Sequence, residues 1–210
     1  KNTINSGLEN DKKGSLFLFV DEFTNFNDAH IGITTIKLLN ALRYEVKILD
    51  HAESGRSYLS KGLLDEAKEI ATKNINTFGD KVNEQTPLVG IEPSAILGFR
   101  DEYPNLIDKQ YRTKAESLAK NTLTFEEFLA KELDQGNIDN TLFNSLEKRI
   151  KLHGHCHQKA LSSMVHSKKI LSLPKNYKVE LIPSGCCGMA GSFGYEKEHY
   201  DVSMQIGELV

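Results

Sequence analysis

The sequence predicts an α/β protein in which parallel strands are flanked by helices. Short apolar runs of strand length alternate with segments whose apolar residues recur at helical spacing. This alternation occurs twice, before about residue 101 and again after about residue 149. Strands that alternate with helices favour a parallel sheet with right-handed crossovers. We therefore expect two similar α/β halves joined by a helical connection.

The first half, residues 15–101, contains three apolar runs and three helical patterns. Leu63, Leu64, Ala67, Ile70 and Ala71, for example, share one face of a helix whose other face is charged. Strands are expected at 16–20, 45–49 and 87–91, and helices at 31–42, 61–75 and 94–100.

The remaining chain divides into a connection, residues 102–148, and a second half, residues 149–210. The connection contains two helical patterns, at 111–120 and 124–133, and the second of these begins with a capping-box pattern at Thr124. In the second half, strands are expected at 150–153 and 177–182, and a helix at 158–173. The third strand of the second half is not found within the chain.

The two ends suggest a piece of a longer polypeptide. Residues 1–14 are polar and without pattern, which is typical of a linker or a disordered end. The last residues, 202–209, form an amphipathic helical pattern that runs to the end of the sequence.

Composition excludes several classes of function. The net charge of −3 and the pI near 6.2 lack the basic footprint of a nucleic-acid-binding protein. No apolar stretch approaches the roughly 20 residues of a membrane helix, and there is no secretory signal. Three cysteines form no disulfide framework, so we expect a reducing, cytoplasmic location with thiols that are free to bind metal.

The two halves align without gaps at one segment. Residues 44–49 match 177–182, and the same offset of 133 places Gly55 on Gly188. Glu53 and Ser54 then correspond to the adjacent cysteines Cys186 and Cys187. These matches favour an internal duplication, and we expect a solvated loop at Glu53 and Ser54.

The three cysteines are the candidate site. Cys156, Cys186 and Cys187 each follow an expected strand, and ligands of parallel sheets bind beyond the carboxyl ends of strands. A disulfide between adjacent cysteines is strained, whereas their thiolates suit zinc or an iron–sulfur cluster. Gly185 and Gly188 would allow close backbone approach or positive φ. The alternative is a small buried residue at Cys156 and an inert turn.

The histidines around Cys156 form an alternating pattern. His153, His155 and His157 would share one face of an extended segment, opposite Cys156. This placement favours roles near the metal or in proton transfer. Direct zinc ligation by His155 or His157 requires that the strand end before Cys156. The alternative is a set of polar residues at a strand end.

A nucleotide-phosphate loop is a weaker interpretation of the glycines between 185 and 194. The segment contains neither G-x-G-x-x-G nor a following Lys-Ser pair. Tight backbone packing around a metal-binding turn fits better.

The segment from His153 to Gly194 resembles the cysteine-rich CCG domain. Its motifs are His155-Cys156-His157-Gln158-Lys159 and Gly185-Cys186-Cys187-Gly188-Met189-Ala190-Gly191. That domain occurs in the iron–sulfur subunit of glycolate oxidase and in heterodisulfide reductase. The chain looks most like the C-terminal region of fused FAD-linked oxidase/iron–sulfur oxidoreductases, and the first half resembles a CCG repeat without its cysteines.

The resemblance implies that Cys156, Cys186 and Cys187 are metal ligands. It implies an iron–sulfur electron-transfer domain of an FAD-dependent 2-hydroxy-acid dehydrogenase, acting on D-lactate, glycolate or 2-hydroxyglutarate. FAD-binding and ferredoxin-like domains would be the partners, with FAD outside this chain, which alone would be inactive. The alternative is a zinc-stabilised or metal-free structural or docking domain, and a thiol–disulfide active site is a third reading. The family's closing cysteine would lie beyond Val210, so the site is expected to be incomplete.

Overall fold

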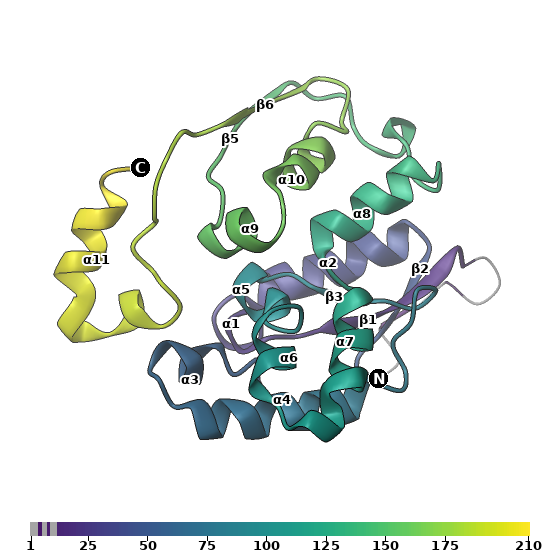
Figure 1. Cartoon of the computed structure of the whole chain (residues 1–210). Coiled ribbons are helices and arrows are strands. Elements are labelled where there is room, and N and C mark those ends of the chain that lie inside the picture. Colours follow the sequence, from purple (N-terminus) through teal and green to yellow (C-terminus); the bar gives the residue numbers. More distant parts are fainter. Residues whose placement is uncertain (1–3, 6–7, 9–11) are drawn as a thin grey trace. The chain divides into compact units, whose positions relative to one another are not determined.

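The computed structural model describes residues 4–5, 8 and 12–210, which form two compact units (Figure 1). The first unit extends to Leu59 and continues from Leu63 to Phe125; the second comprises Ser60–Gly62 and Glu126–Val210. No helix in the described part of the chain has the length and apolarity needed to cross a membrane.

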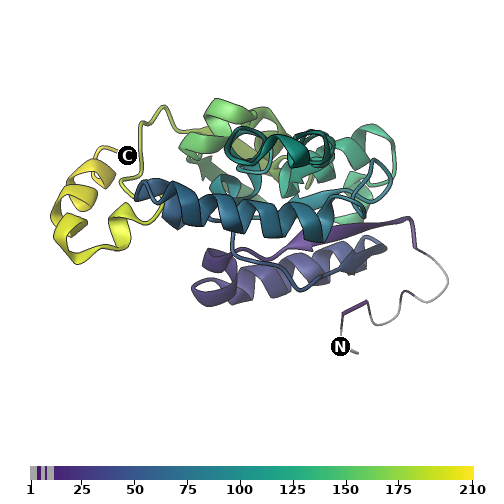
Figure 2. The same cartoon turned by 60° about the horizontal axis from the view of Figure 1, so that its bottom comes forward.

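The first unit is built on a four-stranded parallel sheet, in which the sequence predicts the parallel arrangement and three of the strands. Its strands lie in the order β2-β1-β3-β4, with bounds β1 (Gly14–Phe19), β2 (Tyr44–Lys47), β3 (Leu88–Gly90) and β4 (Thr122–Thr124). The chain passes from β1 outward to β2 and then back across β1 to β3. Right-handed crossovers in opposite directions place their helices on opposite faces. Figure 2 shows α2 (Ala29–Ala41) and α4 (Leu64–Phe78) on the two sides of the sheet.

Both faces of this sheet are covered, so its central strands are apolar throughout. Leu16, Leu18 and Phe19 of β1 are fully buried, and Phe19 packs edge-on against Phe78 and Phe99. The shorter helices of the unit are α1 (Glu22–Phe26), α3 (Arg56–Ser60), α5 (Pro93–Leu97), α6 (Glu102–Leu106), the 3₁₀ turn η1 (Lys109–Tyr111) and α7 (Arg112–Lys120).

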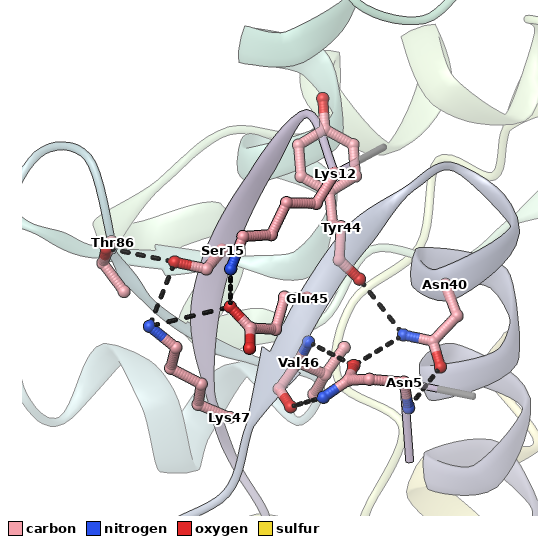
Figure 3. Close-up of polar contacts among 9 residues, drawn as sticks. All are labelled: Asn5, Lys12, Ser15, Asn40, Tyr44, Glu45, Val46, Lys47 and Thr86. Atoms are coloured by element: carbon pink, nitrogen blue, oxygen red, sulfur yellow. Dashed lines mark hydrogen bonds and ion pairs between the residues drawn. The ribbon is translucent and has the colours of Figure 1, made fainter. Parts of the chain in front are cut away.

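The outer edge of β2 is closed by the side chain of Asn5 (Figure 3). Its amide nitrogen donates to the Val46 carbonyl at 2.9 Å, and its amide oxygen accepts from the Val46 N–H at 2.8 Å. The side chain thus substitutes for a neighbouring strand, whose absence leaves an edge open to association. The linker expected at 1–14 falls partly on residues 1–3, 6–7 and 9–11, which lie outside the described residues. Asn5 itself is held by these bonds.

The second unit contains a two-stranded parallel sheet, β5 (Lys148–Leu152) and β6 (Tyr177–Leu181). Helix α10 (Met164–Leu171) packs against β6. The other elements are α8 (Phe125–Asp134), which begins at the last residue of the first unit, η2 (Asn140–Leu142), α9 (Cys156–Leu161), η3 (Phe193–Tyr195), η4 (Lys197–His199) and α11 (Tyr200–Gly207).

Two elements differ from the sequence prediction. The helix expected at 158–173 is two helices, α9 and α10, because Ser163 leaves the helical conformation and its side chain caps α10 through the Val165 N–H at 3.1 Å. The segment 102–148, expected to be helical, also contains the strand β4. Its three residues are too few for a period-two pattern to be recognised, and pairing with β3 makes them a strand.

Candidate functional site

The cysteines lie beyond the carboxyl ends of the two paired strands of the second unit. Cys156 is the first residue of α9, after a three-residue loop that follows β5. Cys186 and Cys187 lie in the loop that follows β6. Because β5 and β6 are parallel neighbours with Leu152 opposite Leu181, both loops leave the sheet at the same edge. This is the edge at which the sequence predicts the site.

The thiols of Cys156 and Cys186 lie near enough to each other to influence ionisation of Cys156. Cys156 is exposed, yet partial desolvation of its sulfur raises the pKa of the thiol, and Cys186 and Cys187 raise it further. Lys159 opposes this shift through its positive charge. Like-charge repulsion from its neighbours favours the protonated form of Cys156, so a bound cation would be needed to stabilise its thiolate.

Two polar contacts join the loop after β5 to the loop after β6. Lys159 of α9 donates from Nζ to the carbonyl oxygens of Ser184 and Gly185, at 3.2 and 3.4 Å. His153 Nδ1 and Ser184 Oγ form a hydrogen bond of 2.6 Å. Both contacts fix the start of the Cys186-Cys187 loop relative to α9. The sequence places Lys159 in the motif around Cys156 but indicates no role for it, and it gives no signal for the role of Ser184.

Gly188 is required by the backbone of the cysteine loop. Its φ is +90°, and a Cβ built there would lie 2.2 Å from the Ser203 carbonyl oxygen of α11. Ser203, which is buried, donates from Oγ to the Gly188 carbonyl at 3.0 Å. The Gly188 N–H donates to Cys186 Sγ at 3.3 Å. Helix α11 therefore packs directly on the turn that follows the cysteine pair.

Gly185 differs from Gly188 both in its backbone φ and in the space around its Cα. It does not adopt positive φ, and a Cβ built there would meet nothing within 4 Å. Of the two glycines expected to shape the turn, only Gly188 shows a requirement for glycine.

The histidines do not share the face of a strand, contrary to the sequence prediction. Strand β5 ends at Leu152, and His157 lies in the first turn of α9. His155 is the N-cap of that helix, and its Nδ1 accepts from the His157 N–H at 3.2 Å. Burial, followed by the nearby His157, His153 and Lys159, lowers the pKa of His155 to about 4. The local preference for a helix N-cap replaced the extended segment that the alternation suggested.

The chemistry of the donor set fits a thiolate-binding metal or cluster. The three thiols of the loops after β5 and β6 are soft ligands of the kind that zinc and iron–sulfur clusters take. Among residues 4–5, 8 and 12–210, however, no three His, Cys, Asp or Glu side chains form a group that could hold a metal ion. The structure thus places the three cysteines in neighbouring loops without forming a coordination sphere.

The corresponding place in the first unit holds a different arrangement. The register Gly14 with Tyr44 is matched by Lys148 with Tyr177, so Glu22, at the start of α1, occupies the position of Cys156, at the start of α9. Ser54 donates to the Glu22 carboxylate from its N–H at 2.8 Å and from Oγ at 2.6 Å.

The expectation of a solvated loop holds for the exposed Glu53 but is wrong for Ser54, which is buried. Ser54 is 3% exposed, and its carbonyl accepts from the Tyr103 hydroxyl at 3.0 Å. Asn74 donates to the same hydroxyl at 2.9 Å and to the Glu53 carbonyl at 2.7 Å. Burial raises the pKa of Tyr103. These bonds satisfy the backbone of the loop from within the unit, so water is not needed there.

Comparison with known proteins finds similarity to parts of dehydrogenases. The chain is 26% identical over 198 residues to a subunit of the anaerobic glycerol-3-phosphate dehydrogenase of Escherichia coli K12, and the match covers 93% of the chain and 48% of that protein. It is 27% identical over 199 residues to the D-2-hydroxyglutarate dehydrogenase of Escherichia coli K12, covering 94% of the chain and 19% of that protein. The corresponding protein of Pantoea ananatis is 26% identical over 202 residues, which cover 96% of the chain and 19% of that protein.

No family model matches the chain, and no solved structure matches it. The chain spans about half the length of the first of these relatives and about a fifth of the others. By sequence it is related to parts of oxidoreductases.

Proposed function

We propose that this chain is an iron–sulfur-binding electron-transfer domain of an FAD-dependent 2-hydroxy-acid dehydrogenase. The observation that carries the proposal is the position of Cys156, Cys186 and Cys187 in the two loops that follow the parallel strands β5 and β6. Similarity to a D-2-hydroxyglutarate dehydrogenase supports the substrate class, which is D-lactate, glycolate or 2-hydroxyglutarate.

The three cysteines would be the protein's ligands, and a bound iron–sulfur cluster would supply one-electron transfer. Iron–sulfur clusters usually take about four protein ligands, so a further ligand must join these three. Lys159 and Gly188 hold the loop that carries Cys186 and Cys187. The first unit, in which Glu22 and Ser54 replace thiols, serves as scaffold or interface.

Flavin chemistry belongs to other parts of the enzyme in this proposal. FAD would bind to another domain of the same polypeptide or complex, and a ferredoxin-like domain would pass electrons to the cysteine site. The presence of a dehydrogenase subunit among the relatives agrees with a domain that works in a larger assembly.

A second candidate is a zinc-stabilised or metal-free structural or docking domain of the same oxidoreductase. Two observations favour it. No three potential ligands in the described residues already surround a common point, and the equivalent place in the first unit is closed by hydrogen bonds without a metal.

Metal analysis of the complete protein distinguishes the two. The protein is purified without oxygen, and its iron, acid-labile sulfide and zinc contents are measured together with electron paramagnetic resonance spectra before and after addition of substrate. We expect stoichiometric iron and sulfide, and a cluster signal that changes when D-2-hydroxyglutarate, D-lactate or glycolate reduces the flavin.

Single serine substitutions of Cys156, Cys186 and Cys187 should each lower the iron content and abolish the cluster signal while flavin reduction by substrate persists. Gly185→Ala is the matched control, because its loop position has open space for a methyl group. Stoichiometric zinc with unchanged turnover in Cys186→Ser would establish the structural alternative, and iron-free protein with full electron transfer to the acceptor would overturn the relay.

A further inference from the structure

The return loop, residues 189–196, follows the cysteine pair and turns back on itself. Ala190 and Gly191 both adopt positive φ, +41° and +69°. Such a backbone is strained for alanine and persists only where surrounding contacts hold it. Within the loop, the Gly194 N–H donates to the Met189 carbonyl at 2.9 Å. The strain at Ala190 requires further contacts from residues outside the loop.

These contacts come from a strap of three residues, Ser60–Gly62. The strap groups with the second unit, although its neighbours in sequence on both sides belong to the first. Ser60 lies against the return loop, since a Cβ built at Gly191 would meet the Ser60 side chain at 3.3 Å. The hydroxyls of Ser60 and Ser192 also approach to 3.3 Å. The strap thus packs on the loop at its strained residues.

Glu196 ties the end of the return loop to the strap. Its Oε1 pairs with Lys61 Nζ at 2.7 Å and accepts from Ser192 Oγ at 3.4 Å. Its Oε2 lies 3.2 Å from His199 Nδ1, and the His199 ring stacks on Phe193. The hydrogen bond from Lys61 lowers the pKa of Glu196, and the charges of Lys61 and His199 add to this shift although desolvation opposes it. Glu196 is therefore a carboxylate at neutral pH.

The return loop is linked to the cysteine turn through α11. A Cβ built at Gly194 would lie 2.7 Å from Ser203 Oγ, and the same hydroxyl donates to the Gly188 carbonyl at 3.0 Å. The Gly188 N–H in turn donates to Cys186 Sγ at 3.3 Å. A restraint on the return loop is therefore also a restraint on Cys186.

The ion pair between the strap and the return loop is easily broken. The Lys61 and Glu196 side chains are 51% and 27% exposed. An exposed pair contributes little stability, and salt screens it. Loops that bind ligands belong to the least stable parts of a protein, because they must move. A pair of this strength can hold the cysteine turn and still release it.

We propose that Lys61 and Glu196 form an ionic latch that holds the Cys186-Cys187 turn in place and frees it when the pair breaks. Both are positioning residues, since they act on the turn through the return loop. The latch rests on contacts within the chain and not on the metal that the cysteines bind. Its failure would leave the proposed function untouched, and loss of that function would leave the latch.

The test follows the mobility of the turn in the complete protein, freed of metal by a chelator under reducing conditions. Alkylation of Cys186 by iodoacetamide, which is uncharged, is measured by mass spectrometry. Amide hydrogen exchange of residues 186–196 is measured on the same samples, with residues 148–152 of β5 as the internal reference.

Lys61→Met and Glu196→Gln are the latch variants, because each removes the ion pair and keeps a side chain of similar size. Lys197→Met and Glu198→Gln are the matched controls. They change the same charges at exposed residues beside Glu196 and remove no ion pair between described residues.

We expect each latch variant to speed alkylation of Cys186 and exchange of residues 186–196 roughly two- to fivefold, the range for loss of an exposed ion pair. The controls should match wild type. Raising NaCl from about 0.05 to 0.5 M should speed both reactions in wild type, because salt screens the pair, and should not do so in the latch variants. The reversed pair Lys61→Glu/Glu196→Lys should recover most of the lost protection.

Unchanged rates in the latch variants, or a salt response that survives in them, would overturn the proposal. A reversed pair that behaves like the single variants would do the same. Faster exchange that extends to residues 148–152 would show that the whole unit has loosened, which also contradicts a latch on the turn.

Discussion

Ser54 and Glu22 are joined by two hydrogen bonds, from the Ser54 N–H and Oγ to the two carboxylate oxygens, at the place where the second unit holds its cysteines. The loops that carry Ser54 and Cys187 are alike in backbone, since Gly55 and Gly188 both take positive φ, +74° and +90°. One backbone arrangement thus carries a closed polar network in the first unit and exposed thiols in the second. Chemistry at such a sheet edge is decided by few side chains.

Replacing Ser54 by alanine should destabilise the first unit. The substitution removes a hydroxyl that donates to a carboxylate and accepts from the Arg56 N–H at 3.1 Å, at a residue that is 3% exposed. A buried hydrogen bond to a charged group contributes about 1.5–3 kcal/mol. Urea unfolding should show a loss of this size, and the exposed Ser117→Ala should show almost none. Equal stability of the two variants would mean that the network is not stabilising.

Replacing Asp21 by asparagine should stabilise the protein near neutral pH. Burial, and then the charges of Glu92 and Glu22, raise the pKa of Asp21, although its bonds with Thr24 oppose the shift. The folded protein therefore holds the proton more tightly than the unfolded chain. The free energy of unfolding of the wild type therefore falls as pH rises. The fall begins near about 3.9, the pKa of an aspartate in the unfolded chain, and continues through the higher pKa of Asp21 in the folded protein.

The asparagine side chain of the variant does not titrate, so the stability difference between Asp21→Asn and wild type should grow in favour of the variant across that window. Unfolding free energies measured from about pH 3.5 to 7 test this, because the range brackets the unfolded value, with the exposed Asp65→Asn as the comparison. A difference that is constant with pH, or that grows in the opposite direction, would contradict the raised pKa.

Gly188→Ala should loosen the contact between the cysteine loop and α11, whereas Gly185→Ala should not. A methyl group at Gly188 would lie 2.2 Å from the Ser203 carbonyl oxygen, and the positive φ there is strained for alanine. A methyl group at Gly185 would meet nothing within 4 Å. Limited proteolysis should cut Gly188→Ala more than tenfold faster near α11. Equal cleavage of the two variants would show that the turn relaxes without cost.

In the metal-binding domain that we propose, Lys159→Met should weaken metal retention without unfolding the second unit. The substitution keeps the aliphatic stem but removes the bonds to the Ser184 and Gly185 carbonyls, which hold the cysteine loop beside α9. Competition with a chelator should show metal loss several-fold faster than in wild type. Lys168→Met, in α10, is the control. If both variants retain metal as the wild type does, contacts other than those of Lys159 hold the cysteine loop in place.

Asn5→Ala should destabilise the first unit through the edge of β2. It removes two hydrogen bonds to the Val46 backbone and a third from the Asn40 amide to Asn5 Oδ1, and it leaves a partly buried edge open. Each neutral bond contributes about 0.5–1.5 kcal/mol, so three bonds correspond to a loss of about 1.5–4.5 kcal/mol. Asn105→Ala removes a single exposed bond to the Asp101 carbonyl and should cost less. The reverse order in urea unfolding would exclude a sealing role for Asn5.

Much of the fold was predictable because apolar periodicity reflects which faces are buried. The strands at β1, β2, β3, β5 and β6 and the helices α2, α4, α7 and α8 follow such patterns to within a few residues. The parallel arrangement follows from their alternation. Short elements escaped prediction, since β4 has three residues and exists through its pairing with β3.

For the candidate site, the sequence by itself determined which edge of the sheet the three cysteines occupy, whereas their role as metal ligands stays a prediction. The alternation of strands with helices dictates that Cys156 and the Cys186-Cys187 pair leave neighbouring strands at one end. It did not determine that Lys159 holds the cysteine loop, nor that Glu22 and Ser54 close the equivalent place. Those outcomes depend on contacts between residues up to 32 positions apart, as for Ser54 and Glu22. Only tertiary structure brings such residues within the few ångströms over which hydrogen bonds and charges act.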